Sequence, residues 1–172
     1  MVLNRLCRES IVKKRLLEAL RALYEGIDDY DVQIEGGTVQ VVFLHEGRLA
    51  VPATRLSDGT LRYLCLLSIL CHPNPPPLVC IEEPELGLHP DVLPTLADLL
   101  KEAAERTQLI VTTHSDILVD ALTDRPEDVL VAEKTVSGTT ITRLDTQRLE
   151  SLLRKYSLGQ LWTRCEIGLT RW

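Results

Sequence analysis

"LVCIEEPELGLHP", residues 78–90, is the stretch that decides the fold. It begins with a continuous apolar run that ends in carboxylates, which is typical of a strand buried inside a parallel sheet. Pro84 ends the strand, because proline cannot donate a hydrogen bond to a neighbouring strand. Open α/β sheets bind ligands at the carboxyl ends of their strands. The segment therefore predicts a parallel strand with a ligand site directly after it.

The two carboxylates at the end of this strand, Glu82 and Glu83, carry the candidate chemistry. Adjacent strand residues point to opposite sides, so the two glutamates can serve different tasks. One can hold the hydration shell of a Mg²⁺ ion, and the other can orient a water molecule for attack. An acidic turn that is merely solvated at the edge of a sheet is the alternative, and this pair alone does not exclude it.

"LIVTTHSDIL", residues 109–118, repeats the arrangement, with His114 and Ser115 at the end of a second apolar strand. Ser115 is a predicted N-cap for the helix that follows. The ends of neighbouring parallel strands lie along one crevice, so we expect His114 and Glu83 to face a common ligand. A histidine at a strand–helix junction also has a purely structural interpretation, which stays open.

"RLSDGTLRYL", residues 55–64, opens a segment that is apolar on nearly all sides and predicts a buried helix. Ser57 is a predicted N-cap, and Asp58 suits the positive end of the helix dipole. Gly59 permits the close approach of another backbone. A helix N-terminus also binds anions. Because Asp58 already supplies negative charge, any phosphate here is expected to arrive on another molecule, and capping alone is the alternative.

Apolar strands alternate with helices in the second half of the chain, which predicts an α/β fold with a mostly parallel sheet covered by helices. The expected strands are residues 78–82, 109–113, 128–134 and 139–144, and the expected helices are residues 91–106 and 116–122. An amphipathic helix over residues 3–25 and a small antiparallel layer over residues 30–53 precede them. The expected parts are an N-terminal helix (1–26), a lobe that carries the motifs (27–145), and a C-terminal helix with a tryptophan-containing tail (146–172).

The charge and the cysteine content exclude several classes of function. The net charge is -6 and no basic tail is present, so the chain by itself is not expected to bind DNA. The five cysteines lack the spacing of a metal or redox site, which predicts free thiols in a reducing, cytoplasmic location. No apolar run approaches the roughly 20 residues that span a bilayer, so no membrane association is expected.

In this order, the segments resemble the C-terminal half of an ATP-binding-cassette (ABC) ATPase. "LSDGT" is similar to the signature motif, "LVCIEE" to a Walker B strand, "PELGLHP" to the D-loop, and "VTTHS" to the switch-histidine segment. The chain most resembles the RecF-like and overcoming-lysogenization-defect-like AAA-type ATPases, relatives of the structural-maintenance-of-chromosomes (SMC) heads. The resemblance covers residues 54–118, and the tail through residue 172 is similar too. The fold that it implies is a partial ABC-ATPase head.

The resemblance implies a nucleotide contact for the signature segment. Ser57 and Gly59 would contact the γ-phosphate of an ATP that is held mainly by the opposite protomer, with Asp58 between them in the binding motif. The family commonly has Leu-Ser-Gly-Gly in this place, so Asp58 departs from its pattern. A signature motif of this kind also implies a homodimer in the complete protein.

The resemblance also implies roles for the residues at the strand ends. Glu82 would support Mg²⁺ through water, at a position that is usually aspartate in the wider superfamily. Glu83 would polarise the attacking water, and His114 would sense the γ-phosphate. The chemistry of such a site is positioning and charge stabilisation of a phosphoryl group during its transfer.

The sequence holds no phosphate-binding loop, because G-x-x-x-x-G-K-[ST] does not occur in its 172 residues. Without the backbone amides and the lysine of that loop, the β- and γ-phosphates have no cradle. We therefore expect the chain to hydrolyse ATP only with a Walker A lobe or a full-length ATPase protomer as its partner. Met1 would then mark an engineered boundary, the start of a degraded gene, or one half of a split ATPase.

Two other interpretations stay open. A non-catalytic module derived from such an ATPase would use the signature face for dimerisation or for docking a partner. A Toprim-type nuclease fragment would place Glu133 after a strand, as this sequence does, but its second acidic pair is not evident. Relatives act in DNA repair, chromosome organisation and defence against phage, and the sequence does not choose among these processes.

Overall fold

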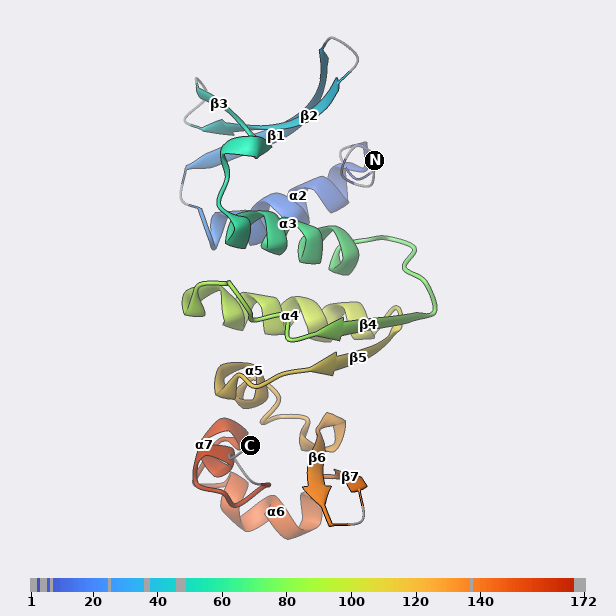
Figure 1. The fold of residues 1–172 in the computed structure, drawn as a ribbon, viewed down its shortest axis with the longest axis vertical. Helices are drawn as coiled ribbons and strands as arrows, with labels where there is room; N and C mark the ends of the chain where they lie inside the picture. Colours follow the sequence, from blue (N-terminus) through green and yellow to red (C-terminus); the bar gives the residue numbers. More distant parts are fainter. Residues whose placement is uncertain are drawn as a thin grey trace. The chain divides into compact units, whose positions relative to one another are not determined.

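Two structural units make up the chain, Met1–Thr112 and Thr113–Trp172, and each is described by itself. The computed structural model describes residues 3, 6, 8–24, 26–35, 38–45, 49–136 and 138–168 (Figure 1). The predicted divisions after residues 26 and 145 stay predictions. Within the described ranges, no helix combines the length and the apolar character needed to cross a bilayer.

The first helix of this unit with described bounds is α2 (Ser10–Arg21), which lies within the helix predicted over residues 3–25. Arg21 closes the turn after the helix, because its guanidinium donates to the backbone carbonyls of Ile27 at 2.9 Å and Asp28 at 3.1 Å. The buried side chains of the helix come from Leu16, Ala19 and Leu20. Ile11, which the apolar pattern also assigns to the buried stripe, is instead 84% exposed.

A three-stranded antiparallel sheet follows α2, in the order β1–β2–β3. Its strands are Ile27–Glu35, Thr38–His45 and Leu49–Pro52. Tyr30 of β1 pairs with Phe43 of β2, and both rings are buried with their centroids 6.2 Å apart. The predicted antiparallel layer is therefore confirmed. The predicted turn at Gly36-Gly37, and all of the "HEGR" turn except His45, lie outside the described residues.

The helix predicted to be buried on nearly all sides is α3 (Asp58–Leu70), which follows the 3-10 turn η1 (Ala53–Arg55). The prediction is wrong for one face of the helix, where Cys65 and Ile69 are exposed. The helix begins at the predicted N-cap, Ser57. The hydroxyl of Tyr63 donates to the backbone carbonyl of Ala19 at 3.2 Å, which joins α3 to α2. Figure 1 shows the two helices side by side. The buried apolar side chains of α3 are Tyr63, Leu64, Leu66, Leu67 and Leu70.

Strands β4 (Leu78–Glu82) and β5 (Gln108–Thr112) form the predicted parallel pair. Exposed and half-buried residues alternate along both strands, so the prediction that they are buried on both faces is wrong for the described residues. The uncovered face exposes 46% of Leu78 and 50% of Ile110. Parallel strands of this composition are normally covered on both faces, so this pair lacks a covering layer on one side.

Helix α4 (Leu93–Ala104) packs against β5 and is tied to both earlier helices. The guanidinium of Arg15 in α2 donates to the Glu102 carboxylate from Nε at 3.0 Å and from Nη2 at 2.5 Å. Arg106, just after α4, donates to the backbone carbonyl of Leu70 at the end of α3, at 2.7 Å. Helices α2, α3 and α4 are therefore held together by polar contacts as well as by apolar packing.

The predicted third and fourth strands do not extend the parallel sheet. Strands β6 (Leu130–Thr135) and β7 (Gly138–Arg143) instead pair with each other in an antiparallel hairpin. The reason is the connection, since residues 136–137 are too few for the crossover that a parallel pair requires. The α/β class is unaffected, but within the described residues the parallel sheet has two strands.

The rest of the second unit is a small helical cluster around its own core. Helices α5 (Asp116–Asp120) and α7 (Leu158–Thr163) pack closely, because a Cβ on Gly159 would lie 2.5 Å from the backbone oxygen of Asp116. The predicted C-terminal helix is α6 (Thr146–Leu153). Trp162 packs against the core, as expected, whereas Trp172 lies outside the described residues. The buried core residues are Val119, Leu149, Leu158, Leu161 and Ile167.

Two acidic groups in the helical layer predict how stability depends on pH. Burial raises the pKa of the Cys71 thiol to about 11 and that of the Tyr63 hydroxyl to about 12. In the unfolded chain the pKa is 9.0 for the thiol and 10.0 for the phenol. Below these values both groups are neutral in both states, and their contribution to stability is complete. As the pH rises above them, the unfolded chain loses its protons first, so the unfolded state is favoured and stability falls. We therefore expect the free energy of unfolding to fall between about pH 9 and about pH 12.

Urea denaturation at about pH 8 and about pH 11 measures this decline. Cys71→Ala is expected to remove part of it, whereas Cys65→Ala, at an exposed position, leaves it in place. A decline that is the same in Cys71→Ala and in the unaltered chain would contradict the assignment to Cys71.

Candidate functional site

Glu82 and Glu83 stand at the carboxyl end of β4, where the sequence predicts them. Glu82 is exposed and pairs in register with Thr112 of β5. Glu83 has left the strand direction, with a φ of 42° that lies in the left-handed region. Its backbone N–H still donates to the carbonyl of Thr112 at 2.9 Å. The two consecutive carboxylates therefore belong to the point where the chain turns away from the parallel pair.

The loop after the carboxylates, residues 84–90, is tightly folded. The N–H of Leu86 donates to the carbonyl of Glu83 at 3.1 Å, and that of Leu88 donates to the carbonyl of Glu85 at 3.0 Å. Gly87 has a φ of 73°, which glycine adopts at little cost. His89 caps the short helix η2 (Pro90–Val92), since its Nδ1 accepts from the N–H of Asp91 at 3.3 Å.

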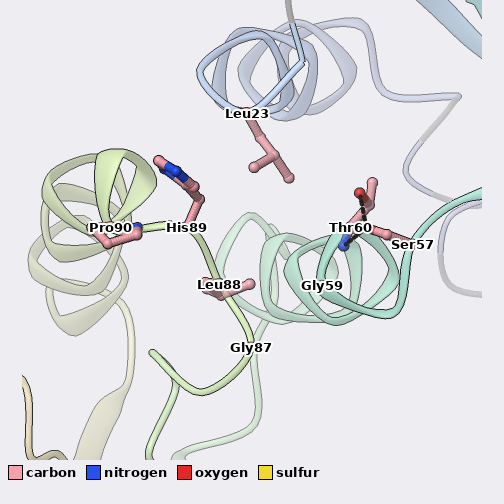
Figure 2. Close-up of a pocket in the computed structure, with 8 residues that line it drawn as sticks. All are labelled: Leu23, Ser57, Gly59, Thr60, Gly87, Leu88, His89 and Pro90. Carbon is pink, nitrogen blue, oxygen red and sulfur yellow. Dashed lines mark hydrogen bonds between the residues drawn. The ribbon is translucent and has the colours of Figure 1, made fainter.

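The start of α3 and the 84–90 loop line one hollow of about 470 Å³ (Figure 2). Ser57 is the N-cap that the sequence predicts, because its Oγ accepts from the N–H of Thr60 at 3.2 Å. The same Oγ lies 2.8 Å from the hydroxyl of Thr60. Figure 2 shows Leu23 reaching into this space from the α2 side. The residues lining the hollow are Leu23, Ser57, Gly59, Thr60, Gly87, Leu88, His89 and Pro90.

Gly59 has the close backbone neighbour that the sequence predicts. A Cβ at this position would lie 2.4 Å from the carbonyl oxygen of Gly87, which is closer than any side-chain carbon can approach. The first turn of α3 and the 84–90 loop are therefore in direct backbone contact. Asp58, beside it, is exposed in the first turn of the helix, where its charge suits the helix dipole.

His114 lies in the second unit and is exposed. The next residue, Ser115, is the predicted N-cap, since its Oγ accepts from the N–H of Leu118 at 3.3 Å. Its own N–H donates to the hydroxyl of Thr113 at 3.0 Å, so the junction between strand and helix is ordered. The expectation that His114 and Glu83 face one ligand stays a prediction.

Glu82 and Glu83 suit a Mg²⁺ ion that also binds water and phosphate oxygens better than they suit a metal ion whose ligands all come from the protein. In the part of the chain that the structure describes, no three His, Cys, Asp or Glu residues gather into a metal-binding group. Mg²⁺ is usually bound by one or two carboxylates together with waters and substrate phosphates. Glu82 and Glu83, side by side at an exposed strand end, fit this donor set once a nucleotide supplies the phosphates.

Solved structures with the same fold are SMC ATPase heads. A chain from a study titled "Structural biochemistry of ATP-driven dimerization and DNA stimulated activation of SMC ATPases" matches with a TM-score of 0.61 at 15% identity, over 90% of this chain and 96% of that one. An SMC head bound to the C-winged helix domain of ScpA matches with a TM-score of 0.63 at 16% identity. An SMC head with coiled coil and joint from Pyrococcus yayanosii gives 0.61 at 18%. The present chain spans 44% and 29% of these last two chains.

The fold therefore defines the class as a partial ABC/SMC-type ATPase head, which confirms the predicted fold class. The family that matches residues 3–120 is described as "AAA domain, putative AbiEii toxin, Type IV TA system", and the chain belongs to that family. Its sequence is also 32% identical over 98 residues to ABC transporter A family member 7 of Arabidopsis thaliana. That match covers 56% of this chain and 10% of the plant protein, so the chain spans about a tenth of that relative. The chain is thus an AAA domain by family, with the fold of an SMC ATPase head.

Among the residues at the site that sequence reasoning missed, Arg62 makes a contact with Glu83. Arg62 lies five positions after Ser57 in α3, and its Nη2 donates to the backbone carbonyl of Glu83 at 3.0 Å. A single arginine on a helix that is otherwise largely apolar was the available signal. It did not reveal a partner, because the contact spans two segments that are distant in sequence.

Proposed function

We propose that this chain is the C-terminal lobe of an ATP-hydrolysing ABC-type ATPase of the RecF-like or overcoming-lysogenization-defect-like group. It would act only when a second lobe, which carries the phosphate-binding loop and is here called the Walker A lobe, completes the site. The observation that carries the proposal is the hollow shared by the start of α3 and the 84–90 loop, together with the contact from α3 to Glu83. In this account residues 27–145 form the ATPase lobe, flanked by a helical arm (1–26) and a tail (146–172), in the cytoplasm.

Each proposed role is the one that the resemblance implies for the residue, and the position of the residue is compatible with it. Ser57, Asp58 and Gly59 open α3, where backbone N–H groups and the Ser57 hydroxyl can donate to a phosphate oxygen brought by the opposite protomer of a homodimer. ATP and Mg²⁺, when bound, supply the transferable phosphoryl group and the charge that offsets its oxygens. Glu82 is proposed to hold the hydration shell of the ion.

Glu83 and His114 are proposed to act on the reacting groups themselves. The Glu83 carboxylate accepts a hydrogen bond from the attacking water and so orients it. The His114 imidazole, placed after the end of β5, donates to the γ-phosphate and reports its presence. Both side chains belong to strand ends, which is where α/β folds bind their ligands.

The uncovered face of the β4–β5 pair supports the need for a second lobe. Leu78, Cys80 and Ile110 are exposed there, on strands whose composition belongs inside a sheet. The sequence contains no phosphate-binding loop. The present chain covers 96% of one chain in a solved SMC ATPase structure. That SMC ATPase structure therefore contains a polypeptide of about the same length as the present chain.

Mixing tests the proposal. The chain is combined with a Walker A lobe expressed from the neighbouring reading frame, and phosphate release from Mg²⁺-ATP is followed. Turnover that needs both proteins supports the proposal. A stable mixture without turnover, with the chain forming a well-folded oligomer that is indifferent to nucleotide, would favour the non-catalytic docking module instead.

Ser57 lends itself to a test that separates capping from phosphate binding. Ser57→Ala removes the cap and is expected to lower the free energy of unfolding by about 1 kcal/mol. Ser57→Asp keeps a good cap, so its stability should stay within about 0.5 kcal/mol of the unaltered chain, but it places a carboxylate where the phosphate is proposed to bind.

Urea denaturation measures the effect of each variant on stability, and ATP turnover by the mixed lobes measures its effect on phosphate binding. Ser57→Asp is expected to be folded and at least about tenfold slower, because like charges repel. Full turnover in Ser57→Asp would show that Ser57 is a cap and nothing more.

A further inference from the structure

Glu83 has a backbone conformation that needs support from its surroundings. Its φ of 42° lies in the left-handed region, where a residue with a side chain is strained. Such residues persist when neighbouring groups hold them, and they are frequent at functional sites. Hydrogen bonds from neighbouring segments hold the Glu83 backbone in this conformation.

Hydrogen bonds hold the Glu83 backbone from the strand, from the turn and from α3, and the Glu83 N–H also lies 3.4 Å from the hydroxyl of Thr112. The N–H of Glu83 donates to the carbonyl of Thr112 in β5 at 2.9 Å. Its carbonyl accepts from the N–H of Leu86 at 3.1 Å and from Nη2 of Arg62 at 3.0 Å. The bonds from Thr112 and Leu86 belong to the parallel pair and to the turn, whereas the bond from Arg62 reaches Glu83 from the signature helix α3.

The same helix also contacts the middle of the 84–90 loop. Gly59 lies against the carbonyl of Gly87 so closely that no Cβ fits between them. The first two turns of α3 therefore contact the loop at Glu83, where it leaves the strand, and at Gly87, where it turns toward α4. Because α3 contacts this segment at both points, we expect a shift of the helix start to act on the turn at Glu83.

We infer that Arg62 is a positioning residue, which fixes the turn at Glu83 from the signature helix and so transmits the state of that helix to the Glu83 carboxylate. The inference rests on the proposed function for the role of Glu83. In that account the start of α3 meets a nucleotide from the opposite protomer, while Glu83 serves the nucleotide of its own protomer. Arg62 then links the two sites through one chain.

The first test uses the chain alone and does not depend on ATP turnover. Amide hydrogen exchange is measured at Glu83 and Leu86 in the unaltered chain, in Arg62→Gln and in Arg62→Lys. Loss of the guanidinium is expected to speed exchange at these amides about tenfold, and lysine, which keeps a donor, to reverse most of that change. Arg148→Gln, an exposed arginine of α6, is the matched control and is expected to change neither amide.

The second test measures kcat and KM of the chain mixed with its Walker A lobe. Arg62→Gln is expected to lower kcat about tenfold with KM within about twofold, because positioning is lost and binding is kept. In a Glu83→Gln background, Arg62→Gln should have no further effect, since its action passes through Glu83.

The outcomes separate the inference from the proposed function. Unchanged exchange at Glu83 and Leu86 in a folded Arg62→Gln overturns the inference, whatever the turnover. If Arg62→Gln lowers kcat by the same factor in the unaltered chain and in the Glu83→Gln background, the inference is also overturned. Absence of turnover in the unaltered mixture overturns the proposed function, while the exchange data still decide whether Arg62 holds the turn.

Discussion

Replacing Glu83 with glutamine is expected to lower kcat for ATP turnover by the completed ATPase at least about 100-fold, to a residual rate that is still measurable. An amide has nearly the shape of the carboxylate, but it lacks the charge and the basicity that orient and polarise a water molecule. The turn that holds Glu83 uses backbone groups and Arg62, so it should survive the change. Phosphate release by the mixed lobes, measured with saturating Mg²⁺-ATP, gives the rate.

The matched control for this variant is Glu133→Gln. Glu133 lies in β6, in the other unit, and is the carboxylate that a Toprim-type nuclease would require. We expect Glu133→Gln to turn over ATP at the rate of the unaltered chain. A Glu83→Gln variant that keeps more than about a tenth of the rate would remove Glu83 from the proposed chemistry.

Replacing Gly59 with alanine is expected to lower the free energy of unfolding of the chain by about 1–3 kcal/mol. The added methyl group would lie 2.4 Å from the carbonyl oxygen of Gly87, and that neighbour is backbone, which cannot rotate away. The start of α3 and the 84–90 loop must then separate. Because this movement also disturbs the hollow that they line, turnover by the mixed lobes should fall together with stability.

Urea denaturation with Asp58→Ala as the neighbouring control measures the effect of Gly59→Ala. Asp58 is exposed in the same helical turn, so its replacement removes a favourable helix-dipole interaction of about 0.3–1 kcal/mol and creates no clash. If Gly59→Ala costs no more than Asp58→Ala, the close approach of the two segments does not occur in solution.

The local features of the site could be predicted from sequence because they depend on short-range chemistry. Ser57 and Ser115 are N-caps, as residue type and position indicated. Gly59 has a close backbone neighbour, as its lack of a side chain suggested. The carboxylates stand at a strand end because the apolar run favours a strand and Pro84, which cannot donate a ladder hydrogen bond, ends it.

The features that sequence reasoning missed depend on contacts between distant segments. The left-handed turn at Glu83 and its bond from Arg62 join α3 to the end of β4, and no spacing within either segment reveals them. The pairing of β6 with β7 was predicted wrongly because the apolar pattern resembled that of the earlier strands. The two-residue connection between these strands was the stronger signal, since a parallel pair cannot be joined so directly.

For β4 and β5, the burial predicted from the sequence differs from the burial in the structure. The apolar pattern of these strands predicts burial on both faces, and in the described residues one face is exposed. The pattern is consistent with strands that evolved to be covered, and the covering layer is what the proposed second lobe would supply. The mismatch between pattern and burial is therefore itself an argument for a partner.

The most direct test of the central claim, that the chain binds ATP only as part of a completed site, is isothermal titration with ATP and Mg²⁺. The chain alone is titrated first, and then the chain together with its Walker A lobe. The account predicts no heat of binding for the chain alone, and saturable binding once the lobe is present. Tight, saturable binding of ATP by the chain alone would contradict the account, because it would mean that these residues form a nucleotide site without a phosphate-binding loop.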